Sequence, residues 1–319
     1  MIKTALTDLL HIKYPIFNAP MAGSATAELA GAVSNSGGFG MLGMGSTVPD
    51  PEWLGFQIKR VRDITANPFG VGFITSVDGI DSLVRLAIEH KVDLIGHSFS
   101  DPSPYVSDAK KAGIKVLAQV QTVEQAIHAR DSGVDLLVAQ GTDGGGHTGH
   151  IGTISIVPAV VDACPGIPII AAGGITDGRG IIAALALGAS GVWVGSRFVA
   201  SHEWAGPDWA KHALTEVGAD DTVITKSYDL ATDAPFPFQV GHRVIRNQFT
   251  DKWHQNYEEL LEHKEDLKTD IALAMQNADM TIAPVSAGSG SGSIKSVDNV
   301  SKIISTFMDE AESVLKNLI

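Results

Sequence analysis

Short apolar runs alternate with longer segments of helical period between residue 15 and about residue 200. Most of these runs lack a strict apolar–polar alternation, as expected for strands of a parallel sheet that is covered on both faces. Stretches such as 26–36, 123–132 and 178–187 have the period of amphipathic helices. There are eight apolar runs, at residues 15–20, 39–45, 69–75, 94–99, 115–120, 136–141, 168–174 and 191–196.

Eight successive β-α units favour closure of the parallel sheet into a ring. The competing architecture is a doubly wound open sheet, which seldom carries so many consecutive units. In addition, no Gly-x-Gly-x-x-Gly motif follows the first run. We therefore predict an α/β protein in which residues 1–201 form a (β/α)8 TIM barrel.

The pattern changes after residue 200. Residues 202–280 are polar and rich in helical signals, and they predict a smaller helical cap that forms a substrate domain. Residues 281–319 predict a C-terminal segment whose last helix, at 297–318, returns to the barrel. Within this C-terminal segment, the composition of residues 286–293 favours a flexible Gly/Ser linker ahead of the last helix over the alternative, a backbone turn beside the active site.

Composition and charge narrow the function classes. The chain has 319 residues, of which 44% are apolar, and its mean hydropathy is +0.13, so it can bury a large core. The formal net charge is -13 without a basic stripe, which argues against nucleic acid and membrane surfaces as partners. A small-molecule substrate is expected, and the oligomeric state, a homodimer included, stays open.

The cysteine and histidine content and the N-terminal residues limit the possible disulfides, metal sites and cellular locations. Cys164 is the only cysteine, so neither an intramolecular disulfide nor a cysteine metal cluster can form. No His-Glu-x-x-His motif occurs, and we predict no metal site. Residues 1–20 lack a secretory pattern and no apolar run is long enough to span a membrane, so we expect a cytoplasmic protein.

Glycines follow the seventh and eighth predicted strands. The first group is Ala172, Gly173 and Gly174, and the second is Gly195 with Ser196. In barrels, the loops after these two strands often hold a phosphate, because glycine lets backbone N–H groups approach it and a helix N-terminus adds positive potential. The alternative is that the glycines only make tight turns. We predict a phosphate site here, with a hydrogen bond from the Ser196 hydroxyl.

The sixth predicted strand leads into a glycine-rich loop that carries a histidine. The loop begins at Gln140 and includes Gly145 and Gly146 directly before His147. A neutral imidazole at the catalytic face of a barrel can accept a proton or donate a hydrogen bond to a substrate. We therefore predict a catalytic role for His147, whereas the roles of His150 and His97 stay open.

Taken together and in this order, these segments resemble the nitronate monooxygenase family, formerly called 2-nitropropane dioxygenases. The resemblance rests on Ala19-Pro20-Met21 after the first strand, the Gly-Gly-His loop, Gly-Gly-Ile-x-Asp-Gly-Arg at 173–179 and Gly-Ser-Arg-Phe at 195–198. It extends to 69–71, 243–247 and 283–288, and the last of these weakens the linker interpretation. The family binds FMN in a barrel, covers the substrate with a smaller helical domain and has a histidine as its proposed base.

The resemblance implies a role for each matching residue. His147 would be the base, and Gly173, Gly174, Gly195 and Ser196 would hold the FMN phosphate. The other residues expected at the cofactor are Ala19 and Met21 along the flavin ring, Gly145 and Gly146 close to the flavin or substrate, Gln140, Ala172, Gly72 and Gln119. Some members have asparagine where this chain has Gly72 and lysine where it has Gln119, so these two side-chain contacts to the flavin are in question.

The implied reaction is oxidation of an alkyl nitronate, with O2 as electron acceptor and with a carbonyl compound and nitrite as products. The alternatives are FMN-dependent NAD(P)H oxidoreductases, either an enoyl-acyl-carrier-protein reductase or a quinone reductase, because their motifs are very similar. A flavin-free barrel that binds another phosphorylated ligand is the remaining hypothesis. Trp204, Trp209, Tyr228, Phe236 and Phe238 of the cap either shape the substrate pocket or only pack.

Overall fold

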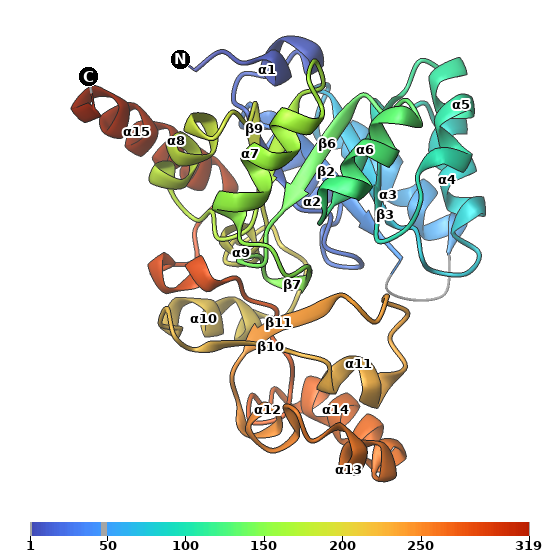
Figure 1. Ribbon diagram of the computed structural model, residues 1–319, viewed down its shortest axis with the longest axis vertical. Coiled ribbons are helices and arrows are strands. Elements are labelled where there is room, and N and C mark those ends of the chain that lie inside the picture. The colour runs from blue at the N-terminus through green and yellow to red at the C-terminus, as the bar shows by residue number, and fades with distance from the viewer. Residues whose placement is uncertain (1, 46–49, 319) are drawn as a thin grey trace.

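The computed structural model describes residues 2–45 and 50–318, and it confirms the predicted (β/α)8 barrel (Figure 1). Eight parallel strands are paired in the order β1-β9-β8-β6-β5-β4-β3-β2, and a bridge between Phe17 and Phe39 closes the ring. Each predicted run contains one of these strands. They are β1 (Ile16–Asn18), β2 (Gly40–Met44), β3 (Phe69–Ile74), β4 (Leu94–Ser98), β5 (Lys115–Val120), β6 (Leu136–Gln140), β8 (Ile169–Ala172) and β9 (Gly191–Val194).

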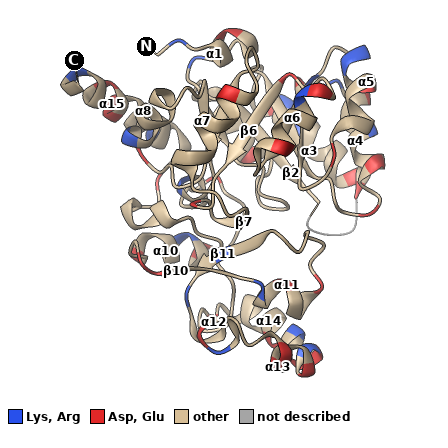
Figure 2. Cartoon of the chain, viewed as in Figure 1, with Lys and Arg blue, Asp and Glu red and all other residues tan. Residues whose placement is uncertain are grey.

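Helices between the strands cover the outside of the barrel. Acidic and basic residues are interspersed on their exposed faces (Figure 2). The last helix, α15 (Val300–Leu318), packs on the first and last helices of this layer and completes it. The layer consists of α2 (Ala27–Asn35), α3 (Pro51–Ile64), α4 (Ile80–Glu89), α5 (Ser103–Lys111), α6 (Val123–Asp131), α7 (Thr153–Ala163) and α8 (Gly178–Ala186).

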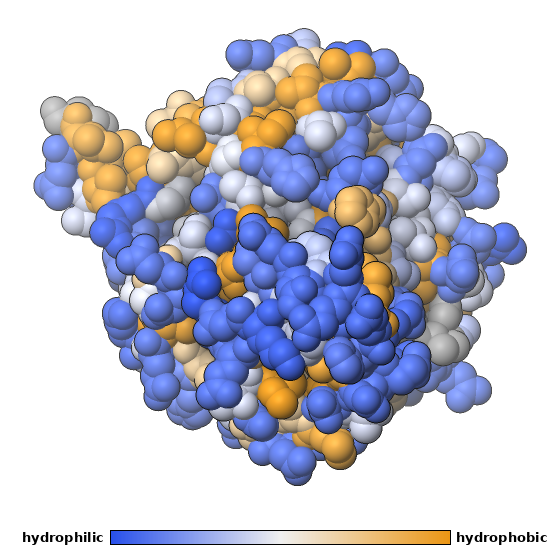
Figure 3. Space-filling model, turned by 60° about the horizontal axis from the view of Figure 1, so that its bottom comes forward, coloured by the Kyte–Doolittle hydropathy of each residue, from blue (hydrophilic) through white to orange (hydrophobic). Residues whose placement is uncertain are grey.

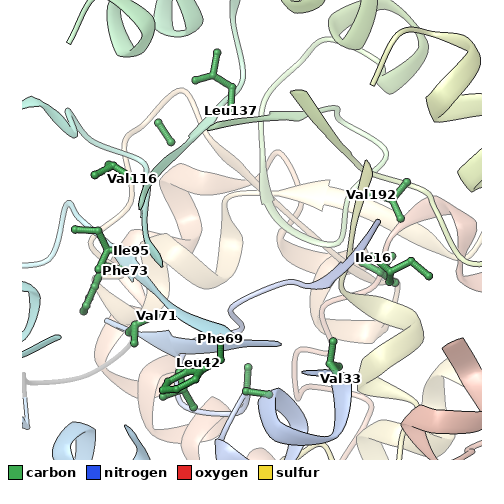
Figure 4. Packing of buried hydrophobic residues seen from close by; sticks show 14 of the residues in the cluster. Ile16, Val33, Leu42, Phe69, Val71, Phe73, Ile95, Val116, Leu137 and Val192 are labelled. Atoms are coloured by element: carbon green, nitrogen blue, oxygen red, sulfur yellow. The ribbon is translucent and has the colours of Figure 1, made fainter. Parts of the chain in front are cut away.

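Strand side chains alternate between two apolar layers. Those that point outward, such as Val71 and Val192, pack beneath the helices (Figure 4). Those that point inward, such as Phe17 and Leu117, pack against Leu6 of α1 (Ala5–Leu10), which lies at the amino ends of the strands. Because α1 fills that end, the site has to lie at the carboxyl ends, as in other barrels of this type.

The cap contains a small sheet that the sequence analysis did not predict. The strands β10 (Thr222–Thr225) and β11 (Gly241–Ile245) pair antiparallel, and β11 also pairs with β7 (Gly146–Thr148) from the glycine-rich loop of the barrel. The cap lies below the barrel in Figure 1, and its outer face is mostly hydrophilic (Figure 3). The helices in and beside it are α9 (Ser196–Val199), α10 (Asp208–Glu216), α11 (Ser227–Thr232), α12 (Gln248–Trp253), α13 (Tyr257–Glu262) and α14 (Lys264–Asn277).

The Gly/Ser segment is ordered, so the prediction of a flexible linker is wrong. Residues Ser289–Ser293 form the 3-10 helix η1. The N–H of Gly288 donates to Ser196 Oγ at 3.0 Å, and the N–H of Ser289 donates to the carbonyl of Asp143 at 3.0 Å. The segment is fixed because its small residues let its backbone reach the loops of the barrel.

Among residues 2–45 and 50–318, every helix is too short or too polar to cross a membrane.

Candidate active site

A pocket at the carboxyl ends of the strands brings together most of the residues expected at the cofactor. These are Ala19, Gln140, Gly145, Ala172, Gly173, Gly174, Gly195 and Ser196. They come from the ends of β1, β6, β8 and β9, which lie far apart in the sequence and side by side in the sheet. The sequence analysis assigned no cofactor contact to the remaining lining residues, which are Gly144, Ile175, Thr176, Trp193 and Gly288.

Backbone rather than side chains forms the wall of the pocket after β8. Gly173 and Gly174 have φ angles of +115° and +72°, which disfavour any other residue. A Cβ added to Gly173 would lie 2.6 Å from Thr153 Oγ1, so the surrounding protein also excludes a side chain there. This arrangement leaves peptide groups along the wall, as a bound phosphate requires.

The helix after this loop, α8, has acidic side chains at its N-terminus. The carboxylate of Asp177 accepts hydrogen bonds from the N–H groups of Arg179 and Gly180. The N–H of Gly178 donates to Glu310 Oε2 of α15 at 2.9 Å. The first turn of α8 is therefore already capped by acidic side chains, whereas α9, which begins at Ser196 after the second glycine loop, has no side-chain cap.

Ser196 and Gly195 form the opposite wall. Ser196 Oγ accepts the N–H of Gly288, so its own proton remains able to bond to a ligand. A Cβ added to Gly195 would lie 3.7 Å from the Cβ of Ala19 and within 4 Å of no other described residue outside its chain neighbours. The space beside Gly195 is thus open to a ligand, to which the Ser196 hydroxyl can donate.

Arg197, the next residue of the Gly-Ser-Arg-Phe motif, supports this wall from behind. Its guanidinium lies 2.7 Å from Asp298 Oδ2 and donates to the carbonyls of Ala200 and Ser296. Both members of the ion pair are only 11% exposed. Hydrogen bonds from Lys302 and Ser296 are the largest causes that lower the pKa of Asp298 to about 2, and Arg197 adds to the effect. Arg197 therefore ties the C-terminal segment to the barrel.

Four residues expected at the cofactor do not line this pocket. Gly72 is covered by Pro20, because an added Cβ would lie 2.4 Å from Pro20 Cγ. Gly146 lies in β7, and Met21 packs between the barrel and the cap. Gln119 borders a separate cavity of about 240 Å³ beside α5 and α6. The asparagine that other members have in place of Gly72 would therefore collide with Pro20 in this chain.

Gln119 is nevertheless connected to the pocket through a chain of amides. Its Oε1 accepts from Ser98 Oγ at 2.8 Å, and its Nε2 donates to Gln140 Oε1 at 2.6 Å. Gln121 Nε2 donates to the same oxygen, and Gln140 Nε2 donates to the carbonyl of His147. The network fixes Gln140 at the pocket and the backbone of His147 beside it.

His147 meets two cap residues. Its Nε2 lies 2.8 Å from Asp229 Oδ1, and both side chains are about nine-tenths buried, with 11% and 10% of their surfaces exposed. His242 lies opposite His147 in the β11–β7 pairing, and the two rings stack with centroids 4.5 Å apart. His147, Asp229 and His242 each place one possible ligand atom within 4.8 Å of the other two, so the three side chains could hold a cation. Their spacing in the sequence did not indicate this.

His242 is uncharged at neutral pH. Burial is the main cause that lowers its pKa to about 3, and the neighbouring His147 adds to the effect. Its Nε2 lies 2.8 Å from Ser286 Oγ, while its buried Nδ1 lies 4.0 Å from Asp229 Oδ1 and has no hydrogen-bond partner among residues 2–45 and 50–318. His242 therefore presents a neutral ring to His147.

Of the five cap aromatics named above, only Phe236 packs on the His147 ring. It stacks with a centroid distance of 3.3 Å, on a ring that His242 also stacks on. Tyr228 lies in the cap core and Phe238 is 77% exposed. Trp204 and Trp209 pack around the junction with the C-terminal segment.

The other two histidines in question lie elsewhere. His97 points away from the barrel interior, stacks on Tyr105 and bonds through Nδ1 to Thr75 Oγ1 at 3.0 Å. Burial lowers the pKa of His97 to about 4. His150 is exposed. Neither borders the pocket. The side chain of His147 does not line it either, but His147 directly follows the glycine loop that does, and Gln140 of the pocket donates to its carbonyl.

Comparisons with known proteins agree with this geometry. The family model described as nitronate monooxygenase matches residues 3–82 and 73–310. A probable nitronate monooxygenase of Staphylococcus saprophyticus is 32% identical, and the match covers 81% of this chain and 83% of that protein. The structure of FabK from Thermotoga maritima superposes with a TM-score of 0.90 at 33% identity and covers 100% of this chain and 99% of that one.

A third relative has a different substrate in its name. It is the (3aS,4S,5R,7aS)-5-hydroxy-7a-methyl-1-oxo-octahydro-1H-indene-4-carboxyl-CoA dehydrogenase of Mycobacterium tuberculosis, 34% identical over 253 residues, which cover 79% of this chain and 68% of that protein.

The barrel, the glycine-walled pocket and the relatives define the class of protein: an oxidoreductase on a TIM barrel, of a kind that is flavin-dependent in general. Within that class, the chain belongs to the nitronate monooxygenase family.

Proposed function

We propose that this enzyme uses FMN to oxidise alkyl nitronates with O2, and that it releases a carbonyl compound and nitrite. The observation that carries the proposal is the position of His147. It directly follows the glycine loop that borders the pocket, its backbone is fixed by Gln140, and its side chain is held from the cap. A buried acid–base group beside a phosphate-sized cradle is what an FMN enzyme of this family needs.

We assign the roles of the residues as follows. The backbone of Gly173, Gly174 and Gly195 and the hydroxyl of Ser196 bind the FMN phosphate. Ala19 and Ala172 border the cofactor without polar side chains. Bound FMN supplies the electron-accepting centre, which the side chains of the chain cannot provide. Residues 202–280 act as the substrate domain, which covers the pocket and limits water.

His147 handles a proton of the substrate. A nitronate has already lost the proton on its α carbon, whereas a neutral nitroalkane has to give it to a base. We therefore expect His147→Ala to retain FMN and to lower turnover of a neutral nitroalkane by at least about a hundredfold, the lower range for the loss of a general base. Turnover unchanged from the wild type would remove His147 from the mechanism.

The test of the proposed function uses the FMN-loaded enzyme without oxygen. Ethyl nitronate, NADH and NADPH are added separately, and bleaching of the flavin absorption is followed; nitrite is then measured after air is admitted. Rapid bleaching by the nitronate with nitrite release, and none by the nicotinamides, is the expected result. Bleaching by a nicotinamide alone would refute the proposal.

The second candidate function is an FMN-dependent NAD(P)H oxidoreductase that acts on an enoyl thioester or a quinone. Two observations favour it: the full-length likeness to FabK and the relative named as a carboxyl-CoA dehydrogenase. After reduction by a nicotinamide, an enoyl thioester and a quinone are supplied in separate reactions. The one that reoxidises the flavin identifies the acceptor.

A further inference from the structure

Asp229 has an unusual environment for a structural carboxylate. Its side chain is 10% exposed, and its Oδ1 makes one side-chain hydrogen bond, to Nε2 of His147 at 2.8 Å. Its Oδ2 is buried and makes no hydrogen bond to any described residue; the nearest cation is Lys226 Nζ, 3.9 Å away. A buried carboxylate oxygen that accepts no hydrogen bond costs stability, which points to a role for Asp229 other than stabilising the fold.

Local structure does not supply that role. Asp229 lies in the first turn of α11, where a negative charge is favourable. However, its side chain caps no N–H of this helix, and the N–H of Ser227 bonds to Thr225 Oγ1 instead. The carboxylate is directed across to the barrel loop, to a partner 82 residues earlier in the chain.

The direction of the hydrogen bond follows from the chemistry of the two groups. An ionised carboxylate only accepts, so Nε2 of His147 has to carry the proton. In the neutral ring, the lone pair then lies on Nδ1, which has no hydrogen-bond partner among the described residues. The neighbouring rings do not compete for the carboxylate, because Nδ1 of His242 lies 4.0 Å from Asp229 Oδ1, beyond hydrogen-bond distance, and Phe236 has no donor.

We propose that Asp229 is the positioning residue of the active site: it fixes the His147 ring with its proton on Nε2 and so directs Nδ1 to the substrate. Because Asp229 comes from the cap and His147 from the barrel, the acid–base group is complete only when the two are paired through β7 and β11. This inference rests on the proposed role of His147 and extends it.

The test compares Asp229→Asn with Asp233→Asn. The asparagine introduced by Asp229→Asn keeps the size of the side chain but can turn its amide donor toward Nε2, which would move the ring proton to Nδ1. Asp233 follows the same helix and is bonded to Lys264 on the surface. Its φ of +57° suits asparagine, so this variant is a matched control for the loss of one carboxylate from α11.

The first measurement is the nitrogen-15 spectrum of the histidine side chains, in which His147 is assigned by its absence from His147→Ala. We expect the Nε2–H tautomer in the wild type and in Asp233→Asn, and its loss in Asp229→Asn. An unchanged His147 tautomer in Asp229→Asn would overturn the proposal. This readout is independent of substrate, so it separates a failure of the Asp229 role from a failure of the proposed nitronate activity.

The second measurement is turnover of a neutral nitroalkane. We expect kcat to fall at least about tenfold in Asp229→Asn and Asp229→Ala while FMN binding is retained. Added formate should restore part of the kcat of Asp229→Ala, because a free carboxylate can occupy the space that the side chain leaves. A kcat within twofold of the wild type in both variants, or a loss that formate does not relieve in a folded Asp229→Ala, would contradict the proposal.

Discussion

Gly195→Ala is the substitution that separates cofactor binding from protein stability most cleanly. An alanine Cβ there lies 3.7 Å from the Cβ of Ala19, an ordinary van der Waals contact, and the φ of Gly195 is -103°, which alanine tolerates. The apoprotein should therefore unfold with a free energy within about 1 kcal/mol of the wild type. The methyl group, however, occupies space in the pocket that we assign to the FMN phosphate.

Forcing a methyl group into a filled site costs about 1–3 kcal/mol, which corresponds to a Kd for FMN that is roughly 5- to 150-fold weaker. The assay is titration of apoprotein with FMN, followed by flavin fluorescence, together with the Tm of the apoprotein. Gly55→Ala in α3 is the control, because its added Cβ meets only His90 Nε2, at 3.8 Å, outside the pocket. An unchanged Tm with a Kd for FMN within twofold of the wild type would refute the assignment of the cradle.

Two further predictions concern stability. Since burial lowers the pKa of His97 to about 4, the unfolded chain binds this proton more readily, and stability is lost as the pH falls below the unfolded value of about 6.5. Between pH 7.5 and 5, the unfolding free energy of His97→Phe should therefore fall by about 2 kcal/mol less than that of the wild type. Urea unfolding at both pH values measures the two decreases, and equal decreases in the variant and the wild type would contradict the prediction. Arg197→Met removes the buried ion-pair partner of Asp298 and should lower the unfolding free energy by about 3 kcal/mol. The control is Arg179→Met: because the Arg179 side chain is 73% exposed, its loss should change the unfolding free energy by less than about 1 kcal/mol. Equal effects in the two variants would contradict a stabilising buried ion pair at Arg197.

The barrel could be predicted from the sequence because its strands are buried on both faces. A strand such as β6 is apolar at successive positions, and that signal needs no knowledge of its neighbours. The cap sheet gave no such signal. β11 is five residues long and only its first and fourth residues are buried, and its partner β7 lies in a distant loop. Strands of this kind are defined by their pairing, which a local pattern does not contain.

The same limit explains which site residues were found. Residues that we propose to bind the cofactor through their backbone, such as Gly173, come with a recognisable motif at the end of a strand. Asp229 has no motif, because its function depends on one contact with His147 across 82 residues of chain. No spacing rule reports such a contact, so Asp229 could be identified only once the cap had been placed against the barrel.

The glycines of the site show why a motif alone does not establish which residues touch the cofactor. We expected Gly145 to lie where a side chain would intrude on the flavin or substrate, yet its added Cβ would lie 2.6 Å from the backbone of Ala287 and Gly288. Its glycine is thus required by the close approach of the C-terminal segment, whatever occupies the pocket. A loss of FMN binding in Gly145→Ala would accordingly follow from a displaced segment as readily as from a blocked cofactor. At Gly195 the protein leaves space for a methyl group, so a loss of FMN binding in Gly195→Ala would report on the cofactor and not on a displaced segment.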